Sequence, residues 1–322
     1  METPVIVEPS PETSPPRAAA PGRSSRRRRP LRLFPYFFVL PFLALFVAFF
    51  IAPLLYAFQQ SLYEERRSGL GFGPPRIVWA GVNNYLKALH DPSFWDGFGR
   101  VLLFGGVQIP LMMLVAILLA LLMDSAVIRF RGFFRLAFFV PYAVPIVIAA
   151  IMWGFFYSPS ASPIVQAFTA LHLPAPVFLG PHVTLWSIAN ISTWEFTGYN
   201  MIIFYSALQG VPQEIYEAGR LDGLSEMGIA LRLKLPVIAP ALVLGLLFSL
   251  VGSLQLFNEP IVLKNLTGSA ITTSYTPNIF AYNIAVVNTD FNYGGAIAVI
   301  LGVITFIFSF GFLRVTRRQF GV

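Results

Sequence analysis

Residues 101–123 read VLLFGGVQIPLMMLVAILLALLM, an apolar run without a charged side chain. An α-helix rises about 1.5 Å per residue, so roughly 20 apolar residues cross the hydrocarbon core of a membrane. Five other segments are equally long, and their only charged side chain is Glu195, near the middle of the fourth predicted helix. We therefore predict six transmembrane helices, at residues 33–58, 101–123, 136–157, 183–211, 235–258 and 291–313.

The composition agrees with an all-α polytopic membrane protein. Hydrophobic residues make up 56% of the chain and charged residues 11%, whereas soluble domains carry about 25% charged residues. The apolar runs do not alternate with polar residues at period two, which disfavours the strands of a membrane barrel. The chain has no cysteine and three scattered histidines. A metal site needs several converging ligands, so we expect no metal site. Without a thiol nucleophile or a metal, we also expect no catalytic residues.

The distribution of basic residues predicts the orientation in the membrane. The tail 1–32, the loops 124–135 and 212–234, and the end of the chain together hold 16 Lys and Arg, against six on the other side. Lys and Arg are enriched on the cytoplasmic side, so both termini are expected there. Asp124, at the end of the second span, is expected to be solvated.

Three domains are predicted along the chain. Residues 1–32 are rich in Pro, Ser, Ala and Arg, and with little apolar surface to bury they should form a disordered basic tail. A basic run next to a membrane span contacts anionic lipid, so we expect membrane lipid and no nucleic acid as its partner. Residues 33–318 form the transmembrane domain, and residues 319–322 form a short C-terminal tail.

The loop 212–236, PQEIYEAGRLDGLSEMGIALRLKLP, is patterned as helix, turn and helix. Pro212 suits a helix start, and acidic Glu214 favours the positive end of the helix dipole. Gly223 interrupts the pattern and can adopt the positive φ that ends one helix before another begins. The loop is too long for a tight connection and too regular for a linker.

This loop resembles the EAA loop of binding-protein-dependent ABC importer permeases, in which EAA is followed after three residues by Gly and after nine more by I-x-LP. The chain has Gly219 in place of the second Ala and Leu233 in place of Ile. The segments LQGVPQEIYE, GVNNYLKAL, DPSFW and FFVPYAVP resemble the carbohydrate-uptake branch, of the maltose and oligosaccharide type. The resemblance covers about residues 33–318.

The resemblance implies a type I importer permease of a bacterial inner or plasma membrane that pairs with a second permease subunit. The loop would seat in a dimer of nucleotide-binding ATPase subunits, and an extracytoplasmic solute-binding protein would deliver the solute. The chain has no phosphate-binding G-x-x-x-x-G-K-[ST] motif, so ATP and Mg²⁺ would belong to the ATPase and this chain would bind no cofactor. The coupling residues implied are Glu217, Ala218, Gly219, Asp222, Gly223, Leu235 and Pro236.

Polar side chains in the fourth and fifth predicted helices mark a candidate substrate site. A carboxylate at mid-membrane depth costs roughly 2.5–3.5 kcal/mol, so Glu195 should face protein or water. At helical spacing Ser192, Gly198 and Tyr199 share its face, and the fifth helix carries a second polar stripe. Sugar hydroxyls form hydrogen bonds with carboxylates and amides, and the apolar face of a sugar ring stacks on aromatic rings. In relatives of the maltose type these two helices hold the sugar, which implies the residues Glu195, Tyr199, Ser249, Gln255, Asn258 and Glu259.

Other functions stay open at this point. A permease for glycerol phosphate or another polyol would need Arg or Lys to bind the phosphate, and the predicted spans contain neither at depth. A secondary transporter could use Glu195 as its proton site, but this class usually has inverted repeats and broken helices, which the sequence does not reveal. An intramembrane enzyme would need a nucleophile with its base, or a metal. Hydrogen bonds between helices of the bundle could also explain the polar stripes.

Overall fold

The computed structural model describes residues 34–66, 76–125 and 128–320, so the predicted tail 1–32 lies outside the described residues. The chain divides into two compact units between Ile51 and Ala52. The first unit consists of helix α1 (Phe34–Phe46) and the π-helical segment η1 (Val47–Ile51). Its large apolar side chains are exposed, for example Phe37 at 74%. A helix that is apolar all round needs an apolar environment such as lipid.

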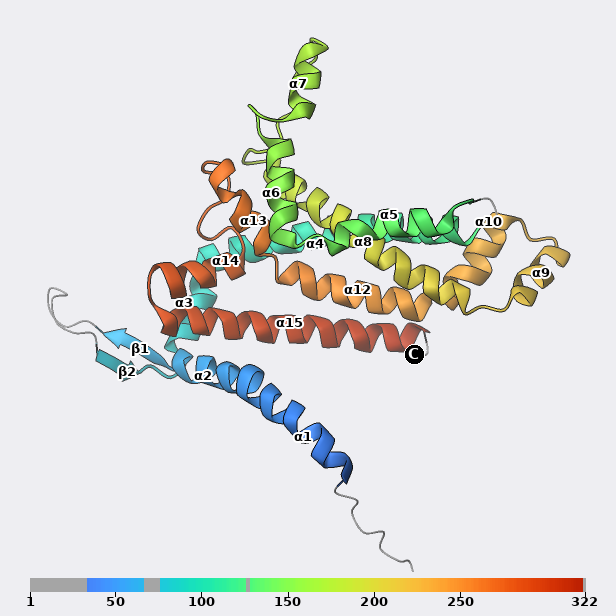
Figure 1. Cartoon of the computed structure of the whole chain (residues 1–322). Helices are drawn as coiled ribbons and strands as arrows, with labels where there is room; N and C mark the ends of the chain where they lie inside the picture. The colour runs from blue at the N-terminus through green and yellow to red at the C-terminus, as the bar shows by residue number, and fades with distance from the viewer. Residues whose placement is uncertain (1–33, 67–75, 126–127, 321–322) are drawn as a thin grey trace, which may run out of the picture. The chain divides into compact units, whose positions relative to one another are not determined.

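The second unit is a set of helices with one small hairpin (Figure 1). Its first half contains α2 (Ala52–Ser61), β1 (Tyr63–Arg66), β2 (Arg76–Trp79), α3 (Asn83–His90), α4 (Pro92–Asp124), α5 (Arg131–Ala143), α6 (Ile146–Tyr157), α7 (Pro163–Ala170) and α8 (Thr184–Gln209). Its second half contains α9 (Gln213–Leu221), α10 (Glu226–Ile229), η2 (Ala230–Lys234), α11 (Leu235–Val237), α12 (Ala239–Leu254), α13 (Asn258–Leu263), η3 (Lys264–Leu266), α14 (Pro277–Tyr282), η4 (Asn283–Val287) and α15 (Phe291–Phe320).

The helices α4, α5, α8, α12 and α15 lie side by side within this unit (Figure 1). Helix α8 packs against both α4 and α5, and α12 packs against both α4 and α15. Two large buried apolar clusters lie along α4 and α8, and a third joins α3, the start of α4, α14 and α15. Helix α8 therefore packs against other helices along its length.

Four helical segments among the described residues are long and apolar enough to cross a membrane, at Phe37–Ser61, Pro92–Asp124, Ala239–Leu266 and Phe291–Thr316. The bent pair α5 and α6 makes a fifth if it counts as one span. The predicted fourth span corresponds to α8, which has the length of a span but not the hydropathy. Its polar side chains are tolerated because Ser192, Glu195, Thr197 and Asn200 are all buried by neighbouring helices.

The predicted third span, 136–157, is broken into two helices. Helices α5 and α6 meet at an angle of 96°, and Val144 between them has an extended backbone with ψ 126°. The residue before a proline is driven out of the helical region by the proline ring, and Val144 precedes Pro145. The prediction of one continuous helix over 136–157 was wrong, because the proline interrupts the helix although the residues on both sides of it are apolar.

The predicted fifth span, 235–258, is also interrupted. Helix α12 ends at Leu254, and α13 begins at Asn258. Pro260 has no backbone N–H, and in a continuous helix its ring would clash with the carbonyl of Leu256. Restarting the helix at Asn258 puts Pro260 in the first turn, where proline is tolerated. Broken helices, which the sequence did not reveal, are therefore present: α5 and α6 are sharply bent, and α12 and α13 are separated by residues 255–257.

Two differences concern residues 59–100, between the first two predicted spans. Helix α4 begins at Pro92, well before residue 101, because the side chain of Asp91 caps it by accepting a hydrogen bond of 2.9 Å from the N–H of Ser93. Strands β1 and β2 form an antiparallel hairpin that pairs Tyr63 with Trp79, which adds a small sheet to the predicted all-α fold. At the other end of the chain, α15 extends to Phe320.

Candidate functional site

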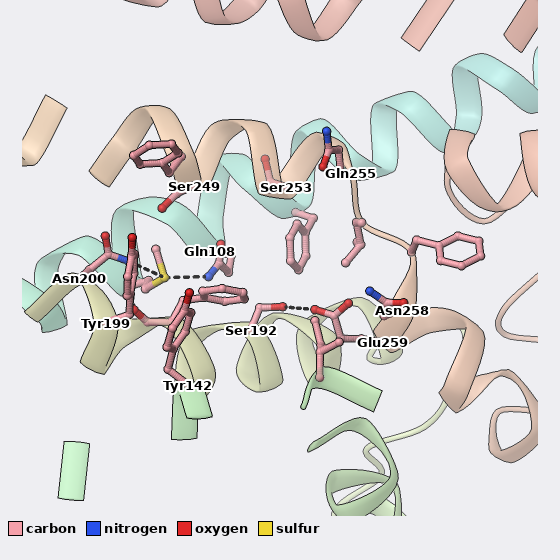
Figure 2. Close-up of a pocket in the computed structure, with 18 residues that line it drawn as sticks. Gln108, Tyr142, Ser192, Tyr199, Asn200, Ser249, Ser253, Gln255, Asn258 and Glu259 are labelled. Carbon is pink, nitrogen blue, oxygen red and sulfur yellow. Dashed lines mark hydrogen bonds between the residues drawn. The ribbon is translucent and has the colours of Figure 1, made fainter. Parts of the chain in front are cut away.

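A cavity of about 380 Å³ lies between α4, α8, α12 and the start of α13 (Figure 2). Its volume falls within the range of about 300–1,000 Å³ that is usual for small-molecule sites. The lining residues are Phe104, Gln108, Met112, Tyr142, Ile146, Ser192, Phe196, Tyr199, Asn200, Phe248, Ser249, Gly252, Ser253, Gln255, Leu256, Phe257, Asn258 and Glu259. Polar groups therefore gather in a region that is otherwise apolar.

The polar groups of the cavity come from α4, α5, α8, α12 and α13 and keep unused hydrogen-bonding capacity. Ser192 on α8 donates a hydrogen bond of 2.8 Å to Oε1 of Glu259 on α13. The amide of Gln108 on α4 reaches only the sulfur of Met112, at 3.4 Å, and a thioether is a weak acceptor. Oδ1 of Asn200 is buried without a hydrogen-bond partner. Amide and carboxylate groups are thus available to a ligand with hydroxyl groups.

A pair of stacked tyrosines forms one side of the cavity. The rings of Tyr142 and Tyr199 lie with centroids 4.5 Å apart and planes 21° from parallel, and both line the cavity (Figure 2). Their approach depends on Gly198, because a side chain there would overlap the backbone carbonyl of Phe138 on α5. Gly198 therefore serves the contact between α5 and α8, and this contact holds the two rings together.

Five of the six predicted substrate residues line this cavity, namely Tyr199, Ser249, Gln255, Asn258 and Glu259. Glu195 does not line it. Its side chain is 4% exposed, and Oε2 has no hydrogen-bond partner. Gln255 and Asn258 flank the interruption between α12 and α13 and do not share one continuous helical face as expected. The interruption brings Asn258 and Glu259 to the cavity from a second direction (Figure 2).

Sequence reasoning missed three polar lining residues, Gln108, Tyr142 and Asn200. Gln108 had a signal in the sequence, since it is the only amide in the predicted span 101–123. Tyr142 lies between Pro141 and Pro145, next to the bend that the structure reveals. Asn200 follows Tyr199 directly, and the assumed helical face excluded it. No group of three His, Cys, Asp or Glu side chains within the described ranges is placed to hold a metal ion.

The loop 212–236 forms the predicted helix, turn and helix. Helix α9 ends at Leu221, and Gly223 has φ +82°, so the predicted positive φ is confirmed. Ser225 then caps α10 by accepting a hydrogen bond of 3.2 Å from the N–H of Gly228. Of the predicted coupling residues, Gly219 is buried and Leu235 is half-buried, while the others are exposed, namely Glu217, Ala218, Asp222, Gly223 and Pro236.

The two departures from the EAA pattern lie against each other. A Cβ at Gly219 would come within 2.8 Å of Cδ1 of Leu233. The side chain of Leu233 therefore occupies the space that an alanine at position 219 would need. Ile229, which is fully buried, lies in the same contact between the two halves of the loop. The absence of a side chain at Gly219 thus leaves room for the side chain of Leu233.

The expectation that Asp124 is solvated was wrong. Its carboxylate forms an ion pair with Lys234 of the loop, and the two side chains are only 8% and 12% exposed. Gln209 at the end of α8 donates a hydrogen bond of 2.8 Å to the other carboxylate oxygen. Nearby Tyr216 on α9 is 6% exposed, and burial, reinforced by the charge of Asp124, raises the pKa of its phenol above the ordinary value of 10.0.

Apolar helices of span length around a small polar cavity, with a helical loop anchored where two of these helices end, define a polytopic membrane protein with a candidate solute site. The comparisons with known proteins name the family. The chain belongs to the binding-protein-dependent transport system inner membrane components, whose family model matches residues 112–317. It is thus an inner-membrane permease, and the resemblance of its loop to the EAA loop of this family is confirmed.

Several relatives carry carbohydrate names, in agreement with the predicted branch. The chain is 28% identical to the lactose transport system permease LacF of Rhizobium radiobacter, over 85% of this chain and 91% of LacF. It is 27% identical to the trehalose/maltose permease MalF of Thermococcus litoralis, over 88% and 93% of the two chains. A chain of the bacterial alginate ABC transporter has the same fold, with a TM-score of 0.76 at 19% identity, over 88% and 95% of the chains.

Proposed function

We propose that this chain is one of two permease subunits of an ATP-driven importer and that it passes a neutral sugar, a disaccharide or oligosaccharide, through the described cavity. The main support for this proposal is the cavity, which is lined by amides, Ser192 and the Glu259 carboxylate and has a stacked tyrosine pair on one side. Sugar hydroxyls pair with such donors and acceptors, and the apolar face of a sugar ring packs on an aromatic ring. The carbohydrate names of the relatives support this assignment.

The charge of the cavity favours a neutral sugar over a phosphorylated solute. A phosphate is bound by Arg or Lys. The described lining residues include no Arg or Lys, and their single ionisable acid is Glu259. A relative named as a glycerol-3-phosphate permease, UgpA of Pectobacterium atrosepticum, is 30% identical over 64% of this chain, but the carboxylate of Glu259 would repel a phosphate.

The proposal includes six transmembrane helices with both termini in the cytoplasm. The excess of Lys and Arg on the tail 1–32 and around the loop 212–236 supports this orientation. Helix α8, the fourth span in chain order, would complete the six and would be kept away from lipid by α4, α5 and the second permease. The loop would bind the ATPase subunits, which hold ATP and Mg²⁺, and a solute-binding protein would supply the sugar from outside. This chain would then carry no catalytic residue.

Uptake by proteoliposomes tests the proposal. The chain is purified with its partner subunits and assayed with radiolabelled maltose, lactose, trehalose and arabino-oligosaccharides. We expect uptake of at least one of these sugars to require ATP on the side of the membrane where the ATPase subunits lie. This uptake should not depend on a proton gradient. Uptake driven by a proton gradient without ATP would overturn the proposal and favour a secondary transporter that uses Glu195.

A variant of the cavity links the function to the site. Gln108→Leu keeps the volume and removes the amide, and we expect uptake to fall by about tenfold, because a lost hydrogen bond in a buried site costs about 1–3 kcal/mol. The matched control is Thr197→Val on α8, whose hydroxyl bonds to the carbonyl of Thr193 at 2.5 Å and does not line the cavity. If both variants take up sugar at the wild-type rate, the cavity does not lie on the transport path.

A further inference from the structure

A buried ion pair joins the loop 212–236 to the rest of the bundle. Asp124 is the last residue of α4, and Lys234 is the last residue of η2 in the loop. Both side chains are nearly enclosed, at 8% and 12% exposure. An ion pair at this degree of burial is only weakly screened by water, so it fixes the relative position of its two elements more firmly than an exposed pair.

The ion pair belongs to a cluster of contacts that joins four elements, α4, η2, α8 and α9. One oxygen contacts Lys234, and the other accepts the hydrogen bond from Gln209, the last residue of α8. The ammonium group of Lys234 also lies 4.9 Å from the centre of the Tyr216 ring on α9, within reach of a cation–π interaction. Both halves of the loop are thus attached to the point where α4 and α8 end.

These same two helices line the cavity. Gln108 and Met112 belong to α4, while Ser192, Tyr199 and Asn200 belong to α8. At about 1.5 Å per residue, Asp124 lies roughly 24 Å along α4 from Gln108. Helices α4 and α8 pack along each other, and packed helices transmit displacements as rigid bodies. A displacement of the loop can therefore reach the cavity through the attachment at Asp124.

We propose that Asp124 is a positioning residue for transport, which with Lys234 and Gln209 fastens the loop 212–236 to α4 and α8 so that movement of the loop moves the cavity walls. This inference rests on the proposed function, because it presupposes that a partner subunit acts on the loop. Removing one charge of the pair leaves the other buried without its partner, and the loop then gains freedom relative to α4.

A second ion pair in the same loop provides a matched control. Arg220 Nε lies 2.9 Å from Oε1 of Glu226, but the two side chains are 52% and 73% exposed. Exposed pairs of this kind contribute little to stability. Glu226→Gln breaks this pair without touching Asp124, so it reports what the loss of any ion pair in the loop would do.

The first experiment measures the attachment without any solute or ATPase. The chain has no cysteine, so spin labels are introduced cleanly by Leu122→Cys on α4 and Leu221→Cys on α9, both exposed positions. We expect a narrow distribution of label distances in the otherwise wild-type chain and in Glu226→Gln. Asp124→Asn and Lys234→Met should each broaden it, and the charge exchange Asp124→Lys with Lys234→Asp should narrow it again. Unchanged distributions in both single variants would overturn the proposal.

The second experiment measures coupling in the complete transporter in proteoliposomes. For Asp124→Asn and Lys234→Met we expect sugar transported per ATP hydrolysed to fall by about tenfold, within the range typical of coupling between distant sites. The ATPase should remain bound. If both variants transport with the wild-type ratio, Asp124 is not a positioning residue. Absence of ATP-driven uptake in the wild-type complex would instead refute the proposed function, while the label distances would still decide whether the attachment exists.

Discussion

Replacing Gly198 by Ala should separate α5 from α8 and disrupt the tyrosine pair of the cavity. Gly198 faces the backbone of α5, where an added Cβ would overlap the carbonyl oxygen of Phe138 and lie 3.2 Å from the N–H nitrogen of Phe139. Backbone atoms cannot rotate away as a side chain can. The helix α5 would have to retreat, and Tyr142 would move with it, away from Tyr199.

The expected cost follows from this geometry. Overpacking of a well-packed interior costs about 1–3 kcal/mol and occasionally more, and a clash with backbone falls at the upper end, about 3 kcal/mol. Alanine stabilises a helix over glycine by up to about 1 kcal/mol. We therefore expect Gly198→Ala to destabilise the chain by a net amount of about 2 kcal/mol or more.

Thermal unfolding of the purified chain in detergent, followed by loss of the monodisperse peak, measures this effect. The control is Gly106→Ala on α4, where an added Cβ would meet nothing within 4 Å, so its melting temperature should equal or exceed that of the wild type. Sugar uptake by the Gly198→Ala complex should fall as well. A melting temperature and uptake equal to those of the wild type would refute the argued contact between α5 and α8.

Three further predictions concern the interior and the loop. Glu195→Gln keeps the volume of the side chain and removes a buried carboxyl group whose Oε2 has no partner, so uptake should persist. Glu259→Gln alters the cavity lining and should lower uptake several-fold in the same assay. The reverse order would place Glu195 in the site. Gly219→Ala should lower the melting temperature and the additional change Leu233→Val should restore it, because the two side chains would compete for one space; no recovery in the double variant would contradict this packing. Burial raises the pKa of Tyr216, so its neutral phenol should stabilise the loop below pH 10. This stabilisation should be lost as the pH rises through the folded-state pKa of Tyr216. The difference in tyrosinate absorbance between wild type and Tyr216→Phe should therefore appear only above pH 10.

The sequence alone was sufficient for the class of protein and for the loop. Long apolar runs must be helical in a membrane, because an α-helix satisfies every backbone hydrogen bond within its own segment. The loop was readable because its signals are local, namely a glycine for the positive φ at position 223 and the fixed spacing to Leu235 and Pro236. Five of the six predicted substrate residues also line one cavity, since polar side chains in apolar helices avoid lipid.

Only the tertiary structure decided which of these residues meet. The interruption before Pro145 bends the predicted third span by 96°. The interruption between α12 and α13 brings Glu259 against Ser192, 67 residues earlier in the chain. The ion pair of Asp124 and Lys234 spans 110 residues, and Glu195 lies outside the cavity although it shares a helix with Tyr199. Sequence periodicity reports the face of a single helix, whereas contacts depend on how several helices pack, and no local pattern encodes that arrangement.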